Sequence, residues 1–256
     1  KEGRIAKTAF EKAREKIAKA INAETKEIVF NSCATEGNNM VLRGYMTGIR
    51  GNIRKNHIIT TSVEHPSVFN TAKTLEKEGF EVTYIPVDEK GRIDLEFLKN
   101  SIKENTGLIS VMMVNNETGN IYPVEEIGLI ARARNILFHV DAVQAVGKIP
   151  VDVKKIGCDF LTISAHKFYG LKGAGALFIK WGKWTAPMIS GGHQEKGRRP
   201  GTENVVGVVG MGRAIELAVS ELDSESARIG EIRDHLERRI LSEIPYTRVI
   251  GDPENR

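Results

Sequence analysis

Short hydrophobic runs alternate with amphipathic segments over most of this 256-residue chain. The runs are rich in β-branched and aromatic residues, which is typical of buried strands. Seven strands are predicted in this way: Glu27–Asn31, His57–Ser62, Glu81–Pro86, Leu108–Val114, Ile136–Val140, Phe160–Ser164 and Ala174–Lys180. Helical spacing of apolar residues fills four of the intervals, near Thr35–Thr47, Ser67–Lys77, Asp94–Glu104 and Val124–Arg134. This alternation indicates βαβ units, so we expect an α/β fold with a mainly parallel seven-stranded sheet covered by helices, a three-layer α/β/α arrangement.

The last predicted strand differs from the others in its connection. It follows its predecessor through a short loop that contains Gly170, Gly173 and Gly175. A parallel neighbour needs a crossover of a dozen or more residues, usually a helix. We therefore expect the last strand to run antiparallel to the strand before it.

Helical patterns dominate the two ends of the chain. A charged amphipathic helix is predicted from Gly3 to Ile21, and two long helices are predicted over Glu203–Leu222 and Ser224–Leu241. Pro245 and Gly251-Asp-Pro253 then indicate a turn, and Thr247–Ile250 has the composition of a beginning strand. We expect a large domain over residues 1–241 and the start of a truncated, smaller domain over residues 242–256.

The charge balance does not favour a nucleic-acid partner. Lys plus Arg number 37 against 33 Asp plus Glu, and the basic residues on helical patterns are interleaved with glutamates, as on solvated helix faces. No apolar run approaches the length of a membrane span, and the polar first helix does not have the composition of a signal peptide. We expect a cytoplasmic protein that binds neither nucleic acid nor membrane.

The two cysteines, Cys33 and Cys158, lie far apart in the sequence. They provide neither a disulfide framework nor a paired-cysteine zinc motif. The six histidines include no pair at the spacing of a helical metal site, so we expect no metal centre.

Polar residues follow several of the predicted strands, where open α/β sheets bind their ligands. After the first strand, Asn31-Ser-Cys-Ala-Thr-Glu36 begins a helix whose N–H groups, with the Thr35 hydroxyl, could hold a phosphate. After the second, the His65 imidazole could stack on a flat cofactor and transfer protons, and after the fourth an amide of Asn115-Asn-Glu-Thr-Gly119 could donate to an anionic ring oxygen. Taken singly, the first two are better explained as a capped helix and a turn histidine, and Asn-rich turns are common for purely local reasons.

Two further strand ends favour pyridoxal 5′-phosphate (PLP) chemistry. Asp141 and Gln144 follow the fifth strand, and Ser164-Ala-His-Lys167 follows the sixth. A lysine that forms a Schiff base and an aspartate that keeps the pyridine nitrogen protonated are what this cofactor requires. Gln144 would reach the ring 3′ oxygen, while Ser164 and His166 would flank the phosphate. A competing dinucleotide pattern, Gly207-x-x-Gly210-x-Gly212, follows no predicted strand and lies inside a helix, so it is interpreted as a packing feature.

Taken together, the ordered motifs resemble those of the cysteine desulfurase family, which belongs to the class V aminotransferase-type, fold-type I PLP enzymes. The resemblance covers nearly the whole chain. It rests on Ser32-Cys-Ala-Thr-Glu-Gly-Asn-Asn39, Glu64-His-Pro66, Asn115-Asn-Glu-Thr-Gly119, His139-Val-Asp-Ala-Val-Gln144, Ser164-Ala-His-Lys167 and Gly201-Thr-Glu-Asn204. The fold expected from it is the fold-type I PLP-dependent transferase large domain.

The resemblance implies a role for each motif residue. Lys167 would carry the cofactor and shuttle the substrate Cα proton, His65 would stack on the ring, and Asp141 would pair with the ring nitrogen. The remaining cofactor contacts would come from Asn115 and Gln144 at the 3′ oxygen and from Ala34, Thr35, Ser164 and His166 at the phosphate. Thr202 would reach the phosphate of a neighbouring subunit, because family members are homodimers with active sites near the interface.

The activity implied is removal of sulfur from L-cysteine, which yields L-alanine and an enzyme persulfide. The sulfur would pass to iron–sulfur cluster assembly or to another sulfur-acceptor protein. The family's nucleophilic cysteine lies on a loop downstream of Gly201-Thr-Glu-Asn204, and neither Cys33 nor Cys158 matches it. We expect the chain to be truncated at both ends, to lack the substrate-binding arginine of the C-terminal domain, and not to complete sulfur transfer alone.

Three alternatives stay open on the sequence. A selenocysteine lyase depends less on the cysteine loop, and a PLP aminotransferase would share the cofactor residues. A non-enzymatic scaffold for a sulfur-acceptor protein needs none of Lys167, Asp141 or the phosphate residues, so their presence argues against it.

Overall fold

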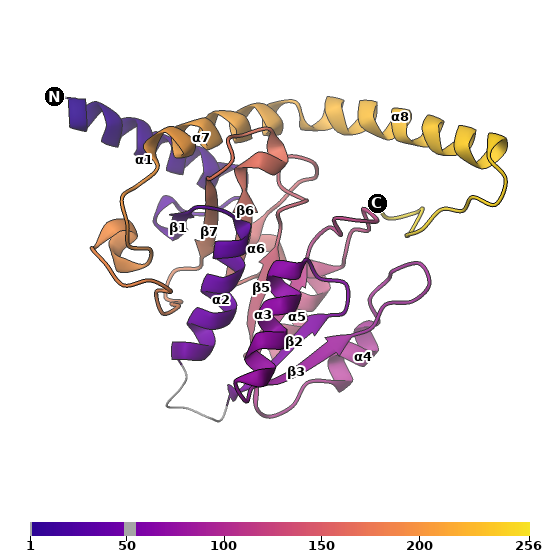
Figure 1. The fold of residues 1–256 in the computed structure, drawn as a ribbon, viewed down its shortest axis with the longest axis horizontal. Helices are drawn as coiled ribbons and strands as arrows, with labels where there is room; N and C mark the ends of the chain where they lie inside the picture. The colour runs from indigo at the N-terminus through magenta and orange to yellow at the C-terminus, as the bar shows by residue number, and fades with distance from the viewer. Residues whose placement is uncertain (1, 49–54) are drawn as a thin grey trace.

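Seven strands form one sheet at the centre of the computed structural model, which describes residues 2–48 and 55–256 (Figure 1). The strands are β1 (Ile28–Asn31), β2 (His57–Thr61), β3 (Glu81–Ile85), β4 (Thr106–Met112), β5 (Leu137–Asp141), β6 (Phe160–Ser164) and β7 (Gly175–Ile179). They lie in the order β1-β7-β6-β5-β4-β2-β3, and β7 runs antiparallel to both its neighbours while the other pairs are parallel. The predicted strands and the reversed last strand are confirmed.

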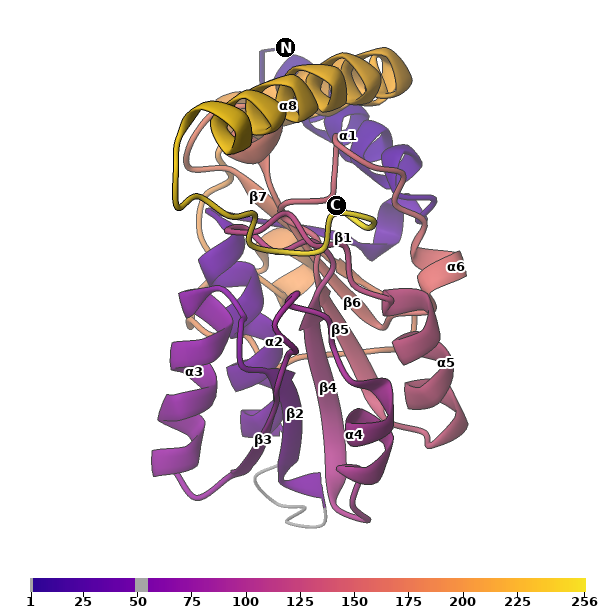
Figure 2. The same cartoon turned by 90° about the vertical axis from the view of Figure 1, so that its right-hand side faces the viewer.

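Helices cover both faces of this sheet, as the alternating side chains of its strands require. One face packs against α2 (Ala34–Gly48) and α3 (Pro66–Lys77), through a core that includes Val41, Val68 and Leu108. The other face packs against five helices: α1 (Glu2–Ala20), α4 (Leu95–Asn100), α5 (Val124–Ala133), α6 (Val153–Ile156) and α7 (Val205–Ser220). Figure 2 shows α3 and α5 on opposite sides of the strands. The three-layer α/β/α prediction is therefore confirmed.

Two helices differ from their predicted extents for local reasons. Asp94 caps α4 by accepting the N–H groups of Glu96 and Phe97, but the helix ends at Asn100, short of the predicted Glu104. The four residues of α6 are too few to produce a periodic signal, so this helix was not predicted.

The glycines of Gly207-x-x-Gly210-x-Gly212 lie in or beside the packed face of α7, as expected for a packing feature. A Cβ added at Gly212 would lie 2.7 Å from the Cβ of Ala13 in α1. The absence of a side chain at this position allows α1 and α7 to cross closely.

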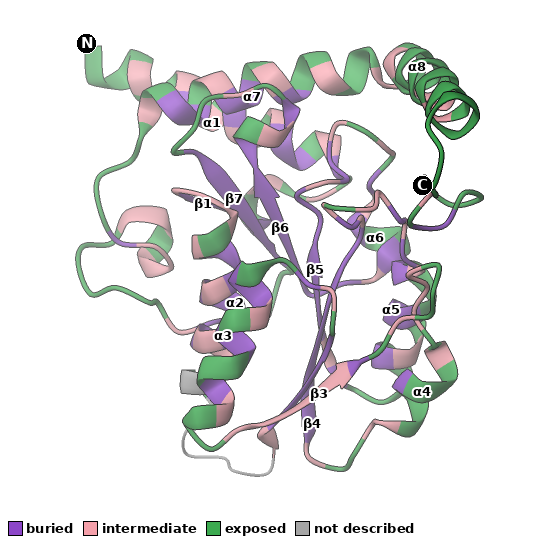
Figure 3. Ribbon diagram, turned by 45° about the vertical axis from the view of Figure 1, so that its right-hand side comes forward, coloured by how far each residue is buried: buried purple, intermediate pink, exposed green. Residues whose placement is uncertain are grey.

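The last helix, α8 (Leu222–Glu243), contains no buried residue and is exposed along most of its length (Figure 3). Beyond it, the predicted turns form at Pro245-Tyr246 and at Pro253-Glu254. The strand expected at Thr247–Ile250 was wrong, because these residues have no regular structure and no strand pairing within the described chain.

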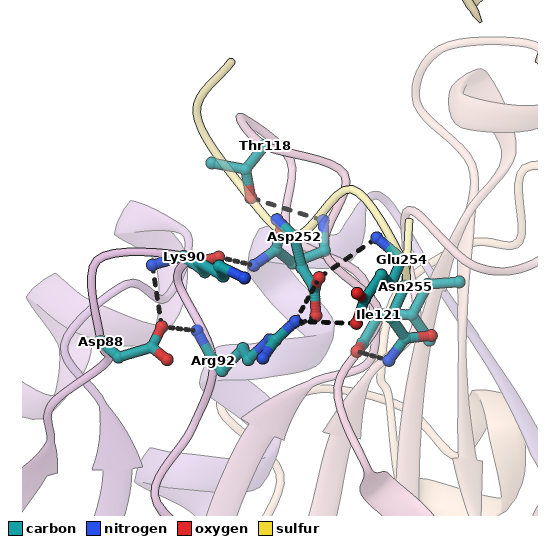
Figure 4. Close-up of polar contacts among 9 residues, drawn as sticks. Asp88, Lys90, Arg92, Thr118, Ile121, Asp252, Glu254 and Asn255 are labelled. Carbon is teal, nitrogen blue, oxygen red and sulfur yellow. Dashed lines mark hydrogen bonds and ion pairs between the residues drawn. The ribbon is translucent and has the colours of Figure 1, made fainter. Parts of the chain in front are cut away.

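The chain instead returns to the loops at one end of the sheet. Asp252 accepts two hydrogen bonds from the Arg92 guanidinium, at 2.6 and 2.7 Å, and its N–H donates to Asn120 Oδ1 (Figure 4). The N–H of Ile121 donates to the Asn255 carbonyl at 2.9 Å. These contacts attach residues 252–255 to the loops that follow β3 and β4.

None of the described helices is both long enough and apolar enough to cross a membrane.

Candidate active site

Four adjacent parallel strands, β2, β4, β5 and β6, end at the same edge of the sheet. Met112 and Asp141 are register partners at the ends of β4 and β5. Ser164 ends β6, and the Glu64-His65 pair follows β2. This edge is where open α/β sheets place their ligands, and it gathers the predicted residues from separate parts of the sequence.

A series of hydrogen bonds joins Asp141 to His65. Asn38 of α2 donates one Nδ2 hydrogen to Asp141 Oδ2 and the other to Ser67 Oγ, each at 2.8 Å. Ser67 Oγ in turn lies 2.8 Å from His65 Nδ1, which also accepts the Ser67 N–H and so caps α3. The carboxylate and the imidazole expected to contact a cofactor ring are therefore positioned by one shared amide.

Burial dominates the electrostatics of Asp141. Its side chain is buried, which raises the pKa of the carboxyl group above its ordinary value. The Asn38 amide, the Val143 N–H at 3.1 Å and the nearby His65 oppose this rise. A positive group placed against the carboxylate would favour its charged form further.

A second buried carboxyl group, Glu64, lies beside this network and was not assigned from the sequence. Its Oε1 accepts the Thr61 hydroxyl at 2.8 Å and the Met112 N–H at 3.0 Å. Its Oε2 is buried and has no hydrogen-bond partner among the described residues. Burial, with a smaller contribution from the negative Asp141, raises the pKa of Glu64 to about 8.

The two predicted amides are held by local contacts. Asn115 Oδ1 accepts the N–H groups of Glu117 and Thr118, and its Nδ2 donates to the Val63 carbonyl at 3.2 Å, which keeps it beside the β2 loop. Gln144 is half-buried, and its Oε1 accepts a hydrogen bond from Lys148 Nζ.

Lys167 lies in a 3₁₀ turn, Ala165–Phe168, directly after β6. The turn ends at Tyr169, which has a left-handed φ of 65°. Lys167 and Gln144 line the same cavity of about 700 Å³. Burial and the positive charge of Lys167 lower the pKa of Lys148, so this second lysine, not predicted as a site residue, lies close to the first.

The predicted phosphate residues follow the ends of β6 and β1, which lie on either side of β7. Ser164, Gly175 and Asn31 form one row of register partners, and α2 begins with Ala34 and Thr35 just beyond it. A Cβ at Gly175 would lie 2.4 Å from Asn31 Oδ1 and 3.0 Å from the Cys33 backbone, so only glycine permits this approach.

At the same end of β6, Ser164 Oγ lies 2.9 Å from His166 Nδ1. Burial and the positive Lys167 and Lys172 lower the pKa of His166. Ser164, His166 and the N-terminus of α2 thus provide a hydroxyl, an imidazole and helix N–H groups, which are groups that bind anions.

Thr202 is exposed and lies in the loop before α7. It lines a pocket of about 150 Å³ with Ser32 and Gly173. Its expected contact with a neighbouring subunit stays a prediction.

A family model for aminotransferase class-V matches residues 1–256. The chain is 50% identical over 254 residues to a cysteine desulfurase IscS of Dictyoglomus turgidum, which covers 99% of this chain and 64% of that protein. Among solved structures, a NifS-like protein matches with a TM-score of 0.92 and 43% identity, over 94% of this chain and 66% of the other. A structure of SspA in complex with cysteine matches with a TM-score of 0.80 and 40% identity, over 84% of this chain and 62% of the other.

The chain thus spans slightly less than two thirds of the length of these relatives. The match to the family model extends over every motif from Ser32-Cys-Ala-Thr-Glu-Gly-Asn-Asn39 to Gly201-Thr-Glu-Asn204. The resemblance inferred from those motifs is confirmed, and the chain belongs to the aminotransferase class-V family.

Proposed function

We propose that this chain is the cofactor-binding large domain of a PLP-dependent cysteine desulfurase. Residues 1–241 would form that domain and residues 242–256 the start of a smaller one. The observation that carries the proposal is the hydrogen-bonded series from Asp141 through Asn38 and Ser67 to His65, at the same sheet edge as Lys167. The identity to cysteine desulfurases supports the choice of reaction.

The residues present fit PLP at both of its ends. Asp141 offers a buried anion for a protonated ring nitrogen, and Asn38 holds that anion in one orientation. At the other end, Ser164, His166 and the first turn of α2 offer a hydroxyl, an imidazole and helix N–H groups for a phosphate. When bound, PLP supplies an electron-poor ring that withdraws charge from the substrate carbon next to the amino group.

The chain's own groups would then orient the cofactor and move protons. Lys167 would provide the amine that attaches the cofactor and would carry the substrate Cα proton, while His65 would stack on the ring. The 3′ oxygen would be held by Asn115 and Gln144, and the phosphate by Ala34, Thr35, Ser164, His166 and, from the neighbouring subunit of a homodimer, Thr202.

The substrate proposed is L-cysteine, and the products are L-alanine and sulfur carried as a persulfide. Support for cysteine comes from the names of the relatives and from the likeness to SspA in complex with cysteine. We propose that the sulfur passes to an iron–sulfur scaffold or another acceptor protein in the cytoplasm. Neither Cys33 nor Cys158 is the proposed sulfur carrier, because Cys158 is buried with its thiol pKa raised and Cys33 directly precedes Ala34 and Thr35 of the proposed phosphate site.

The test is product analysis of a protein that contains this chain at the length of its relatives. With PLP, L-cysteine and a thiol reductant, we expect alanine and sulfide in equal amounts, and none from the Lys167→Ala variant. Conversion of PLP to its amine form with a keto acid would indicate an aminotransferase instead. Turnover of selenocysteine without turnover of cysteine would indicate a selenocysteine lyase, and either result would refute the proposal.

A further inference from the structure

An ion pair connects the first turn of α2, where we propose that the phosphate binds, to the loop that carries Thr202. Arg199 Nε donates to Glu36 Oε1 at 2.7 Å, and Arg199 Nη2 donates to Glu36 Oε2 at 3.2 Å. Glu36 directly follows Thr35 in the first turn of α2. Both side chains are mostly buried, with 19% and 23% of the Glu36 and Arg199 side chains exposed.

Glu36 is held as an anion close to where a phosphate is expected. Burial would raise the pKa of its carboxyl group, but Arg199 and the hydroxyl and N–H of Ser32 donate to it and keep that pKa below its ordinary value. A negative carboxylate one residue after Thr35 opposes binding of a second anion to the same helix turn unless its charge is compensated.

The loop around Arg199 is fixed from its other end by a second ion pair. Arg14 of α1 donates to both carboxylate oxygens of Glu195 at 2.7 Å, and its guanidinium lies over the rings of Phe10 and Phe30. The Phe30 N–H also donates to Glu195 at 2.8 Å. Arg14 is therefore the hydrogen-bonded cation of Glu195, and Arg199, which also feels the charge of Glu195, is the hydrogen-bonded cation of Glu36.

We propose that Arg199 neutralises Glu36 and thereby allows the first turn of α2 to accept the doubly charged phosphate of the cofactor. Arg199 acts through Glu36 as a positioning residue and does not itself need to touch the phosphate. The inference deepens the proposed function and rests on it. A unit charge left uncompensated within about a Debye length of a divalent anion changes its binding constant by about tenfold.

The experiment compares two ligands that differ only in the phosphate. Binding of PLP and of pyridoxal is measured by absorbance titration at low ionic strength for the unmodified chain, Arg199→Gln and the double variant Glu36→Gln/Arg199→Gln. We expect Arg199→Gln to weaken PLP binding about tenfold, to leave pyridoxal binding within about twofold, and to be reversed by the second substitution. Arg199→Lys, which keeps the charge, should retain most of the PLP affinity.

A matched control is Arg43→Gln, which breaks the Arg43–Glu78 ion pair at the far end of the same helix. It removes the same charge but leaves Glu36 compensated, so both ligands should bind as before. Equal weakening of PLP and pyridoxal by Arg199→Gln, no recovery in the double variant, or the same loss in Arg43→Gln would overturn the inference. Failure of the unmodified chain to bind either ligand would instead refute the proposed function, and the inference with it.

Discussion

Replacing Glu64 with glutamine should stabilise the cofactor-free protein, and the gain should increase with pH. Glu64 is buried with its Oε1 bonded to Thr61 and Met112 and its Oε2 without a partner. A glutamine oxygen can accept the same two hydrogen bonds as Oε1 without bringing an ionisable group into the interior. The variant therefore matches the protonated carboxyl group at every pH.

The magnitude follows from the raised pKa of Glu64, which is about 8 in the folded protein against an ordinary value of 4.5. Between these two values the unfolded chain releases the proton while the folded protein retains it, so the free energy of unfolding falls as pH rises. Each pH unit costs about 1.4 kcal/mol, which gives a loss of about 3 kcal/mol at pH 7. The loss stops growing above pH 8, where the folded protein also releases the proton.

Urea denaturation of both proteins at several pH values between 4.5 and 8 measures this difference. We expect nearly equal stability at pH 4.5 and an advantage of about 3 kcal/mol for Glu64→Gln at pH 7. A control is Glu76→Gln on α3, which removes a partly exposed carboxylate whose pKa is lowered by Lys73 and Tyr84, and which should give no such gain. Parallel stability profiles for the unmodified protein and Glu64→Gln would refute the reasoning.

Two other predictions concern buried contacts. Asn38→Ala removes the amide that donates to Asp141 and should lower the free energy of unfolding by about 1–3 kcal/mol in urea denaturation, because the buried Asp141 carboxyl group loses a hydrogen-bond donor. A change below about 0.5 kcal/mol would contradict the assigned network. Gly128→Ala should destabilise the fold by more than about 2 kcal/mol, because the added Cβ would meet the Ile156 carbonyl oxygen at 2.0 Å. The matched Gly230→Ala, with open space around it on α8, should instead raise the melting temperature slightly, and equal effects of the two substitutions would contradict the packing described.

Most of the strands could be predicted from the sequence because they are short runs buried on both faces, whereas the edge strand β3 is half-buried at four of its five residues. In β2 and β4, Ile58 and Leu108 pack into the core on one face of the sheet, and Ile59 and Ile109 pack into the core on the other face. Successive residues of these strands must therefore all be apolar. Helix α6 gave no signal because its four residues, capped by Asp152, are too few to show a period, although Val153 and Ile156 are buried in the core.

The common location of the proposed site residues could also be predicted from the sequence, because strand ends collect at one edge of a parallel sheet. The contacts that hold these residues in place could not be predicted from the sequence. Asn38 shares the buried face of α2 with Val41 and Leu42, and this polar residue on an apolar stripe was the signal for its role. The raised pKa of Glu64 had no such signal, because it depends on burial by β4, which lies distant in the sequence.

The loop from Gln194 to Thr202 illustrates a second limit. Its conformation depends on ion pairs between residues 163 and 181 positions apart in the sequence, which local patterns do not encode. Glu195 and Lys196 both adopt a positive φ there, a conformation that neither residue type favours on its own.

The most direct test of the account is whether Lys167 carries the cofactor. The chain would be incubated with PLP, reduced with borohydride, digested and mapped by mass spectrometry. We predict a single pyridoxyl-phosphate adduct on Lys167 that disappears in Lys167→Ala, whereas Lys148, the neighbouring lysine, remains unmodified. An adduct on Lys148, or none on Lys167 in a protein that binds PLP, would contradict it.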